Sequence, residues 1–287
     1  MKKLKSILVV FNGAETGNGH LKQAVKLAND GNCEVAVAVV LPSANGRPVL
    51  VGVRDVSETA KAVVAKTVTA VKPKIEEIEP QIQTVLEGRV DEAIINVAKE
   101  RQCDLIIIGR GLRAIEAKPE KSFMESVTAR VIGKSPIDVL VMPHGAQIRW
   151  DRILLAIDGS RCSEVAIGKA LALSREFGSS LKIFSVVEVA DEAYGEAPHE
   201  LERLIGKAKQ LVETTKERAE SMHVPAETFV REGSPDERIV VLANDLGSDI
   251  IFMGSYGRTG LRKLFMGSVA EKVIRRTSCP VYVAKSC

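Results

Sequence analysis

The two halves of this 287-residue chain are related to each other. Four segments of the first half match four of the second, at offsets that drift only from 146 to 142 residues. The matched pairs are SILVVFNG (6–13) with RILLAIDG (152–159), VLEGRVDEAI (85–94) with VREGSPDERI (230–239), CDLIIIGRG (103–111) with SDIIFMGSY (248–256), and FMESVTARVI (123–132) with FMGSVAEKVI (265–274). Self-similarity at a nearly fixed offset is typical of a repeated domain. We therefore expect two domains, residues 1–145 and 150–287.

Within each half, short β-branched runs alternate with longer stretches of helical period. In the second half we predict strands at 152–157, 180–188, 226–231, 250–253 and 281–284, and helices at 163–177, about 198–223, 236–246 and 268–276. The nearly continuous apolar runs ILLAI and DIIFM are typical of parallel strands covered on both faces. The predicted fold is α/β: two repeated doubly wound domains, each a five-stranded parallel sheet flanked by helices.

Composition limits the partners that such a chain can have. Lys and Arg (40) nearly balance Asp and Glu (37), which gives a formal charge of +3 and predicts no nucleic-acid partner. No uncharged apolar stretch has the length of a membrane span, and the run from Ile7 to Phe11 is too short for a signal-peptide core, so it predicts a first strand. We expect a cytoplasmic protein without a membrane partner.

Neither cysteine nor histidine spacing predicts a metal site. The five cysteines form no CxxC pair and no dense framework, as expected of reduced thiols in a cytosolic protein. The four histidines are scattered without ligand spacing, so ordinary surface or loop roles are favoured over metal binding.

The stretch MGSYGRTGLRKLFMGS (253–268) has the glycines of a phosphate-binding loop but lacks the GxxxxGK[ST] pattern. Gly254 and Gly257 allow a ligand to approach the backbone closely. Gly267 precedes Ser268 at a predicted helix start, where free N–H groups and the helix dipole favour an anion. In a doubly wound sheet the ligand lies beyond the carboxyl ends of the strands, so we expect this loop to face Asp158 across a crevice.

Several residues in and around this loop also have a structural interpretation that needs no ligand. Arg258 is a plausible phosphate neighbour, whereas Arg262 and Lys263 are better explained as solvated surface charge. Ser268 to Glu271 reads as a capping box, which would stabilise a helix without any ligand. Asp158 could be a turn residue, or it could hold a divalent cation or a ribose hydroxyl.

The second half resembles the universal stress proteins throughout its length. The resemblance rests on ILLAIDGS (153–160) and on GSYGRTGLRKLFMGSVAEKVIRRTSCPVYVA (254–284), which carries a complete G-x2-G-x9-G-S pattern. It implies the adenine-nucleotide-binding branch of the family, a Rossmann-like fold of the adenine nucleotide alpha hydrolase type, and two such domains in tandem. The chain would then bind ATP, ADP or AMP, with Mg²⁺ or Mn²⁺ accompanying the nucleotide.

The resemblance also implies a set of binding residues. Asp158 would contact ribose or phosphate, directly or through the metal ion, and Val186 would hold adenine through its main chain. The remaining positions would line the floor, the sugar side and the phosphates: Ala156, Ile157, Met253, Gly254, Gly257, Arg258, Gly267, Ser268 and Val269. Family members commonly pair through their last strand, here 139–142 and 281–284. An internal pseudo-dimer of the halves and a homodimer of chains are therefore expected.

The first half departs from this pattern at three positions. Asn12 replaces the aspartate, Leu112 falls opposite Gly257, and Glu125 falls opposite Gly267. A glutamate at the helix start would repel a phosphate. Ser122 to Glu125 is itself a capping box, so this helix is expected to begin one turn earlier. We expect one nucleotide per chain, bound by the second half.

Three functions remain open from the sequence. The first is a regulatory stress-response protein that binds an adenine nucleotide and acts on an unknown protein partner. The second is an enzyme, such as a slow ATPase or a phosphotransferase, although the chain offers no Walker lysine and no nucleophile beside a base. The third is an assembly module that binds no nucleotide, which the intact glycine pattern disfavours.

Overall fold

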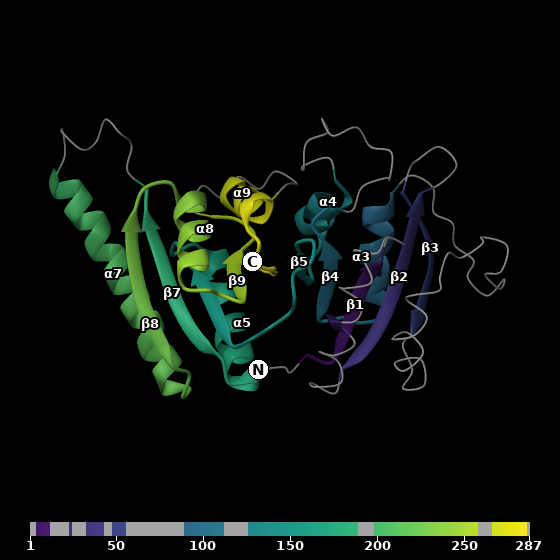
Figure 1. The fold of residues 1–287 in the computed structure, drawn as a ribbon, viewed down its shortest axis with the longest axis horizontal. Helices are drawn as coiled ribbons and strands as arrows, with labels where there is room; N and C mark the ends of the chain where they lie inside the picture. The colour runs from purple at the N-terminus through teal and green to yellow at the C-terminus, as the bar shows by residue number, and fades with distance from the viewer. Residues whose placement is uncertain are drawn as a thin grey trace. The chain divides into compact units, whose positions relative to one another are not determined.

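The computed structural model describes residues 4–11, 23–24, 33–42, 48–55, 89–111, 126–188, 198–257 and 266–285. The chain forms two compact units, one over Leu4–Ile148 and one over Arg149–Cys287. Each unit contains described β-strands that pair with one another, together with its own helices (Figure 1). The repeat seen in the sequence is therefore a repeat of an α/β domain.

The sheet of the C-terminal unit is parallel throughout and has the strand order β10-β9-β6-β7-β8. Its strands are β6 (Arg152–Ala156), β7 (Ser180–Val187), β8 (Ala226–Glu232), β9 (Ile250–Gly254) and β10 (Val281–Ala284). Counted along the unit, this is the order 5-4-1-2-3, so the first strand β6 lies between β9 and β7. The doubly wound fold predicted for this half is confirmed, with each strand end within a residue or so of its predicted place.

Helices cover this sheet as crossovers between parallel strands. They are α5 (Arg161–Phe177), α7 (Pro198–Ser221), α8 (Pro235–Asp245) and α9 (Ser268–Arg276). Helix α5 packs on β6, β9 and β10, helix α7 packs on β7 and β8, and α8 and α9 pack against each other (Figure 1). Since Ser160 caps α5 by accepting from the backbone N–H of Ser163 at 3.1 Å, this helix begins two residues before its predicted start.

The N-terminal unit repeats the strand order but not the strand directions. Its order is β3-β2-β1-β4-β5, with β1 (Ser6–Phe11), β2 (Glu34–Pro42), β3 (Pro48–Asp55), β4 (Leu105–Gly109) and β5 (Asp138–Met142); its described helices of more than one turn are α3 (Val90–Glu100) and α4 (Val127–Lys134). Strand β3 runs antiparallel to β2, so the prediction of a wholly parallel sheet is wrong here. Only five residues separate the two strands, which suits a hairpin, whereas a parallel connection needs a dozen or more.

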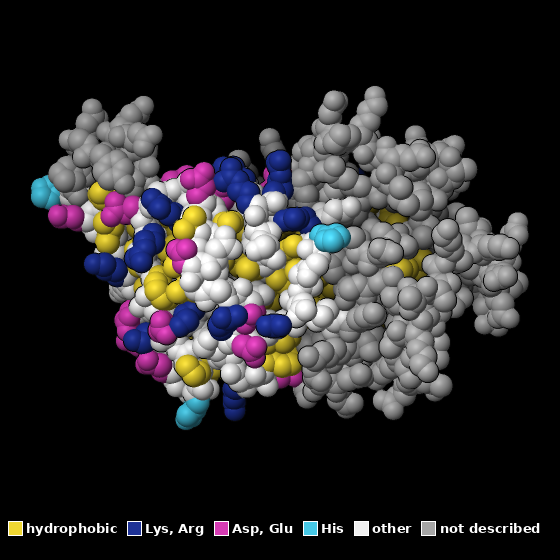
Figure 2. Space-filling model, viewed as in Figure 1, with side chains coloured by type: hydrophobic (Ala, Val, Ile, Leu, Met, Phe, Trp, Pro, Cys, Tyr) yellow, Lys and Arg dark blue, Asp and Glu magenta, His cyan; other side chains and the backbone are white. Residues whose placement is uncertain are grey.

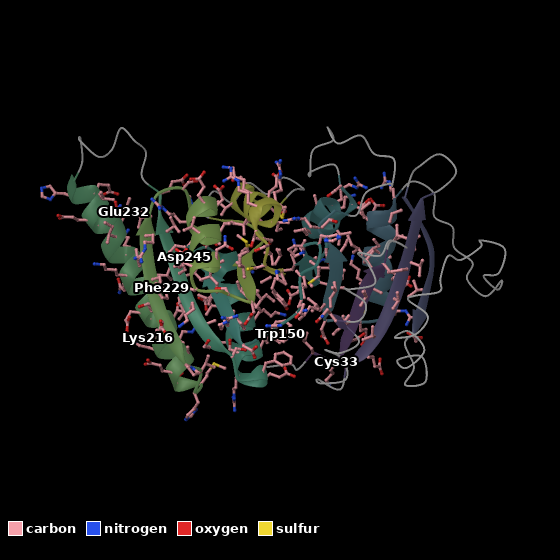
Figure 3. The ribbon with its side chains drawn as sticks, viewed as in Figure 1. Cys33, Trp150, Lys216, Phe229, Glu232 and Asp245 are labelled. Atoms are coloured by element: carbon pink, nitrogen blue, oxygen red, sulfur yellow. The ribbon has the colours of Figure 1, made fainter. Side chains whose placement is uncertain are left out.

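Aliphatic side chains fill the cores, as the shortage of aromatic residues requires. The central strands β6 and β9 are buried along nearly their whole length. Four aromatic rings of the C-terminal unit stack in pairs: Phe252 on Tyr282 with centroids 4.4 Å apart, and Trp150, labelled in Figure 3, on Phe177 at 4.9 Å. Trp150 is the only tryptophan of the chain, so its fluorescence reports on this unit.

Charged side chains of both signs are interspersed over the face of the C-terminal unit seen in Figure 2, in keeping with the balanced composition. No helix within the described ranges has the length and apolarity that a membrane span needs. Cys33, Cys103 and Cys279 are buried and form no disulfide. Cys162 is disulfide-bonded, so the expectation of five reduced thiols is wrong; sequence spacing does not reveal which sulfur atoms the fold brings together.

Candidate functional site

A cavity of about 770 Å³ opens at the carboxyl ends of the strands of the C-terminal unit. It lies beside the junction of β6 and β9, which pair in parallel although the strands β7 and β8 and the helices α5, α7 and α8 lie between them along the chain. This junction is where the strand order reverses, the place at which doubly wound sheets bind ligands. The volume falls within the range of cofactor pockets.

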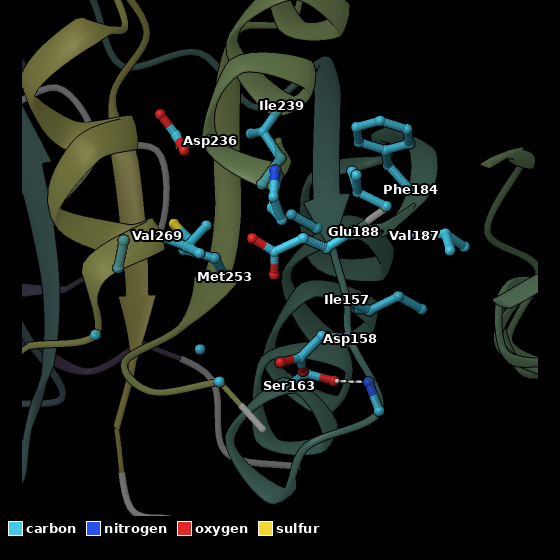
Figure 4. A pocket seen from close by; sticks show the side chains of 18 of the residues that line it. Ile157, Asp158, Ser163, Phe184, Val187, Glu188, Asp236, Ile239, Met253 and Val269 are labelled. Atoms are coloured by element: carbon cyan, nitrogen blue, oxygen red, sulfur yellow. Dashed lines mark hydrogen bonds between the residues drawn. The ribbon is translucent and has the colours of Figure 1, made fainter. Parts of the chain in front are cut away.

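Ten of the eleven predicted binding residues line this one cavity. They are Ala156, Ile157, Asp158, Val186, Met253, Gly254, Gly257, Gly267, Ser268 and Val269. Figure 4 shows Asp158 and Ile157 on one wall and Met253 and Val269 on the opposite side. Arg258, like Arg262 and Lys263, lies outside the described residues. The structure thus brings together the predicted residues that it describes.

Asp158 faces the glycine loop as expected. A methyl group built on Gly257 would come within 2.9 Å of the Asp158 Oδ2 atom, so the carboxylate lies directly against the loop backbone. The other carboxylate oxygen accepts a hydrogen bond from the backbone N–H of Ser160 at 2.9 Å. That bond fixes the carboxylate at the beginning of α5, where it lies beside the loop.

The two ends of the glycine loop touch each other. The backbone N–H of Gly267 donates to the carbonyl oxygen of Ser255 at 2.9 Å. A side chain at Gly267 would meet this oxygen at 3.2 Å and the Cα atom of Tyr256 at 3.3 Å. The hydroxyl of Ser160 donates to the carbonyl oxygen of Tyr256 at 3.4 Å. The base of the loop is therefore closed and is tied to the beginning of α5.

Gly254 has a packing role that the sequence did not reveal. A Cβ atom there would lie 2.7 Å from the carbonyl carbon of Cys162 and 2.9 Å from its oxygen, both in the first turn of α5. Real Cβ atoms do not approach backbone atoms so closely, so only glycine allows β9 to end against this helix. Gly254 is thus required by the fold as well as being placed at the cavity.

Helix α9 has its predicted bounds, Ser268–Arg276, but it is capped differently from the prediction. Gly267, not Ser268, is the N-cap residue, and no side chain caps the helix. The carbonyl of Gly267 accepts the first helical hydrogen bond, from the N–H of Glu271 at 3.0 Å. The predicted capping box is therefore wrong, because Ser268 lies one residue inside the helix. The hydroxyl of Ser268 and the first N–H groups of α9 border the cavity without a side-chain cap.

The matching helix of the N-terminal unit is capped by its own serine. Ser126, the counterpart of Ser268, accepts from the N–H of Ala129 at 3.1 Å, and α4 begins at Val127. The prediction that this helix begins one turn earlier, at Ser122, is thus wrong, since the nearer serine provides the cap. Asn12, Leu112 and Glu125 lie outside the part of the chain that the structure describes.

Helix α7 and the beginning of α8 complete the cavity, and the sequence analysis missed both. Helix α7 contributes Leu204, Lys207, Ala208 and Leu211, and further walls come from Ser163, Phe184, Val187, Glu188, Ser234, Asp236, Ile239 and Lys272. The spacing of Leu204, Ala208 and Leu211 is that of one helix face. This pattern was visible in the sequence, but nothing showed that part of the face would border a ligand site.

Asp236 at the edge of the cavity belongs to a structural ion cluster. Its side chain is only 3% exposed and accepts from Arg276 at 2.6 Å, with Lys272 at 3.5 Å. Both cations lie on α9, so the cluster joins the beginning of α8 to α9. Ser234 adds a hydrogen bond to the same carboxylate at 2.9 Å.

The N-terminal unit contains the same cluster. Asp91 on α3 is 4% exposed and pairs with Arg130 at 2.9 Å and Lys134 at 2.8 Å, both on α4. Burial alone would raise the pKa of Asp91, but the hydrogen bonds from Lys134 and Arg130 outweigh it and hold this pKa below its ordinary value. The cluster is thus part of the frame of each unit, whatever the unit binds.

Tyr256 contributes an aromatic side chain to the cavity beside the loop. Burial raises the pKa of its phenol above the ordinary value, so the ring stays neutral at physiological pH. The ammonium of Lys285 lies over the ring, 5.6 Å from its centroid. Across the described ranges, no three His, Cys, Asp or Glu side chains gather as metal ligands. Asp158 could hold a divalent cation only together with ligands such as phosphate oxygens.

Fold and cavity define a class: a tandem pair of Rossmann-like α/β domains with a ligand crevice at the switch point of the second. Comparison with known proteins gives the family. The sequence model of the universal stress protein family matches residues 3–143 and again 149–285. The chain belongs to this family, with two of its domains in tandem.

Individual relatives agree with this assignment. Universal stress protein MJ0531 of Methanocaldococcus jannaschii is 34% identical over 140 residues, which is 47% of this chain and 82% of that protein. The universal stress protein E homolog of Haemophilus influenzae is 27% identical and aligns with 96% of each chain. A universal stress protein structure from Archaeoglobus fulgidus superposes with a TM-score of 0.66 at 22% identity, over 98% of this chain and 96% of that one. This last similarity concerns the fold alone.

Proposed function

We propose that the C-terminal unit binds one adenine nucleotide, ATP in preference to ADP or AMP, and that the protein is a regulatory stress-response protein, not an enzyme. One observation carries the proposal. The uncapped beginning of α9 and the carboxylate of Asp158 meet across a closed glycine loop, inside a cavity of nucleotide size.

The chemistry of the cavity suits the parts of a nucleotide. Free N–H groups at the beginning of α9 and the hydroxyl of Ser268 can donate to phosphate oxygens, and the helix dipole favours their charge. Asp158 can hold Mg²⁺ or Mn²⁺ jointly with those oxygens, which would offset the repulsion between carboxylate and phosphate. Apolar side chains, among them Phe184 and Ile239, form the part of the cavity that would receive the base.

Within the described part of the N-terminal unit, the matching helix α4 does not repeat the uncapped beginning of α9. In α4 the hydroxyl of Ser126 accepts a hydrogen bond from the N–H of Ala129, whereas no side chain caps α9. We therefore propose a stoichiometry of one nucleotide per chain. The pairing of the last strands, 139–142 and 281–284, and an unknown protein partner remain predictions drawn from the family resemblance.

Slow hydrolysis is the rival function. A metal ion on Asp158 could polarise a phosphate. The hydroxyl of Ser234 donates to the carboxylate of Asp236 within the cavity, but Arg276 and Lys272 already engage that carboxylate. We propose that any phosphate release is far slower than the turnover of ordinary enzymes, about 10 per second. Phosphate release by the purified protein at such rates, abolished by Asp158→Asn, would instead support an ATPase.

The proposal is tested by identifying the small molecule that the purified protein carries, followed by calorimetric titration with MgATP. We expect one site per chain, abolished by Gly267→Glu, because the new carboxylate would lie among the phosphate donors and clash with Ser255 and Tyr256. The matched control is Gly111→Glu, which adds the same charge in the N-terminal unit at a position with open space around it. It should leave binding unchanged. Absence of nucleotide binding by the unaltered protein would contradict the proposal.

A further inference from the structure

Glu188 is a carboxylate in the cavity that the proposed function does not yet use. It is the first residue after β7 and is exposed to solvent. In Figure 4 its side chain extends from the side of Val187 toward Met253, into the space above Asp158. Glu188 forms no hydrogen bond or ion pair with any residue that the structure describes. Its two oxygens are therefore available to a ligand.

A carboxylate in this position restricts what can lie against it. Phosphates would be repelled, and they already have donors at Ser268 and along the beginning of α9. Glu188 can only accept hydrogen bonds when ionised, so it must face donors of the ligand. An adenine nucleotide has two kinds of such donors: the ribose hydroxyls and the 6-amino group of the base.

The location of Glu188 favours the ribose. Asp158 lies at the loop, with its Oδ2 atom beside Gly257 and its Oδ1 atom accepting from the N–H of Ser160, where we propose that it holds the metal ion of the phosphates. In Figure 4 the side chain of Glu188 lies between Phe184 and Met253, and Met253 directly precedes Gly254 of the loop. In a nucleotide the sugar joins the base to the phosphates, so the sugar is the part expected there.

The position of Glu188 in the fold points the same way. In doubly wound domains that bind dinucleotides, an acidic side chain beyond the glycine-rich first turn hydrogen-bonds the ribose 2′-hydroxyl. In this unit Gly159 follows the first strand and Glu188 follows the second, β7. Lys207 on α7 lines the same cavity and forms no ion pair with Glu188 or with another described residue. It therefore leaves the carboxylate free to accept from a sugar.

We propose that Glu188 accepts hydrogen bonds from the ribose 2′- and 3′-hydroxyls and selects ribonucleotides over deoxyribonucleotides. The same carboxylate repels nucleotides that carry a phosphate on either hydroxyl. The inference rests on the proposed binding of an adenine nucleotide and adds the part of the ligand that sets specificity.

The test is a calorimetric comparison of four magnesium-bound ligands on the full chain after removal of copurified small molecules. The ligands are ATP, 2′-deoxy-ATP, 3′-deoxy-ATP and inosine triphosphate, in which a carbonyl replaces the 6-amino group. We expect the unaltered protein to bind ATP about tenfold or more tightly than at least one deoxy analogue, since the carboxylate loses a charged hydrogen bond. Glu188→Ala should bind ATP and both deoxy analogues with similar affinity.

Two further variants test the charge of Glu188 and control for the loss of a carboxylate elsewhere. Glu188→Gln keeps an acceptor of the same size and should retain part of the discrimination. Glu217→Gln removes an exposed carboxylate of α7 that does not line the cavity and should behave as the unaltered protein. Equal binding of ATP and both deoxy analogues by the unaltered protein would overturn the inference while leaving the proposed function intact. The inference would also be overturned if Glu188→Ala did not reduce the discrimination against the deoxy analogues. The same holds if Glu188→Ala reduced only a discrimination against inosine triphosphate. Failure to bind any of the four ligands would overturn both proposals.

Discussion

The glycines of the C-terminal loop are required for three different reasons. Gly254 makes room for the backbone of α5, Gly257 for the carboxylate of Asp158, and Gly267 for the other end of the loop. The sequence predicted all three positions but gave a single reason, the approach of a ligand. The difference arises because the neighbours that a Cβ atom would meet are distant in sequence or depend on how the loop closes.

These contacts predict different outcomes for two alanine substitutions. Gly254→Ala would press a methyl group against backbone that cannot yield, so we expect a loss of about 2–4 kcal/mol of stability. Gly257→Ala meets only a carboxylate oxygen, which a rotation of Asp158 can move, so we expect a loss below about 1 kcal/mol. Urea unfolding of the C-terminal unit, followed by the fluorescence of Trp150, measures both.

For nucleotide affinity we expect a clear effect from Gly257→Ala, the variant with the smaller effect on stability. Gly257→Ala displaces the carboxylate that we propose for the metal ion, and so should weaken MgATP binding in a chain that remains folded. If Gly254→Ala were as stable as the unaltered protein, the close packing of β9 against α5 would be refuted.

Helices α4 and α9 occupy the same place in the two units but begin in different ways. The sequence predicted helix α9 within its observed bounds, yet placed the cap one residue too late. A serine followed three residues later by glutamate satisfies the capping-box pattern, but the extended conformation of Gly267 makes that residue the N-cap. Local pattern predicts the helix, whereas the loop that leads into it determines its first residue.

The difference in capping predicts opposite roles for two equivalent serines. Ser126→Ala should destabilise the beginning of α4 by about 1 kcal/mol, since its hydroxyl satisfies the N–H of Ala129. Ser268→Ala should change stability by less than about 0.5 kcal/mol but weaken nucleotide binding. Hydrogen exchange of the α4 and α9 amides, with a titration of MgATP, measures the two effects. Equal loss of protection in both helices would contradict the assignment.

At the level of the whole chain, the repeat predicted most of the fold. The C-terminal unit has the five strands and four long helices expected of it. The N-terminal unit departs where its sequence has no close counterpart in the other half: β3 (Pro48–Asp55) runs antiparallel to β2. The predicted site residues gathered in one cavity because parallel strands end at the same edge. The walls from α7 and Glu188 were missed because only the tertiary fold brings them there.

The buried ion cluster of the N-terminal unit predicts a dependence of stability on acid. Because the pKa of Asp91 is lowered in the folded state, its contribution is complete above the unfolded pKa and is lost as the pH falls through the folded pKa. Asp91→Asn should therefore cost about 1–3 kcal/mol at pH 7 and progressively less in acid. Urea unfolding followed by far-ultraviolet circular dichroism over pH 3 to 7 measures this difference.

The matched control for this prediction is the exposed ion pair of Asp55 with Arg101. Asp55→Asn should change the free energy of unfolding by less than about 1 kcal/mol at any pH, because solvent screens the pair. A constant difference between Asp91→Asn and the unaltered protein across the whole pH range would contradict the proposed ionisation.

The ion cluster that recurs in both units has a consequence for how such a chain can change. It joins two helices through one buried carboxylate and two basic side chains, and it uses none of the loop glycines. The cluster therefore holds the helices together without the residues that we propose for the phosphates and the metal ion. A duplicated protein built in this way can gain, change or lose a ligand in one copy while both copies still fold.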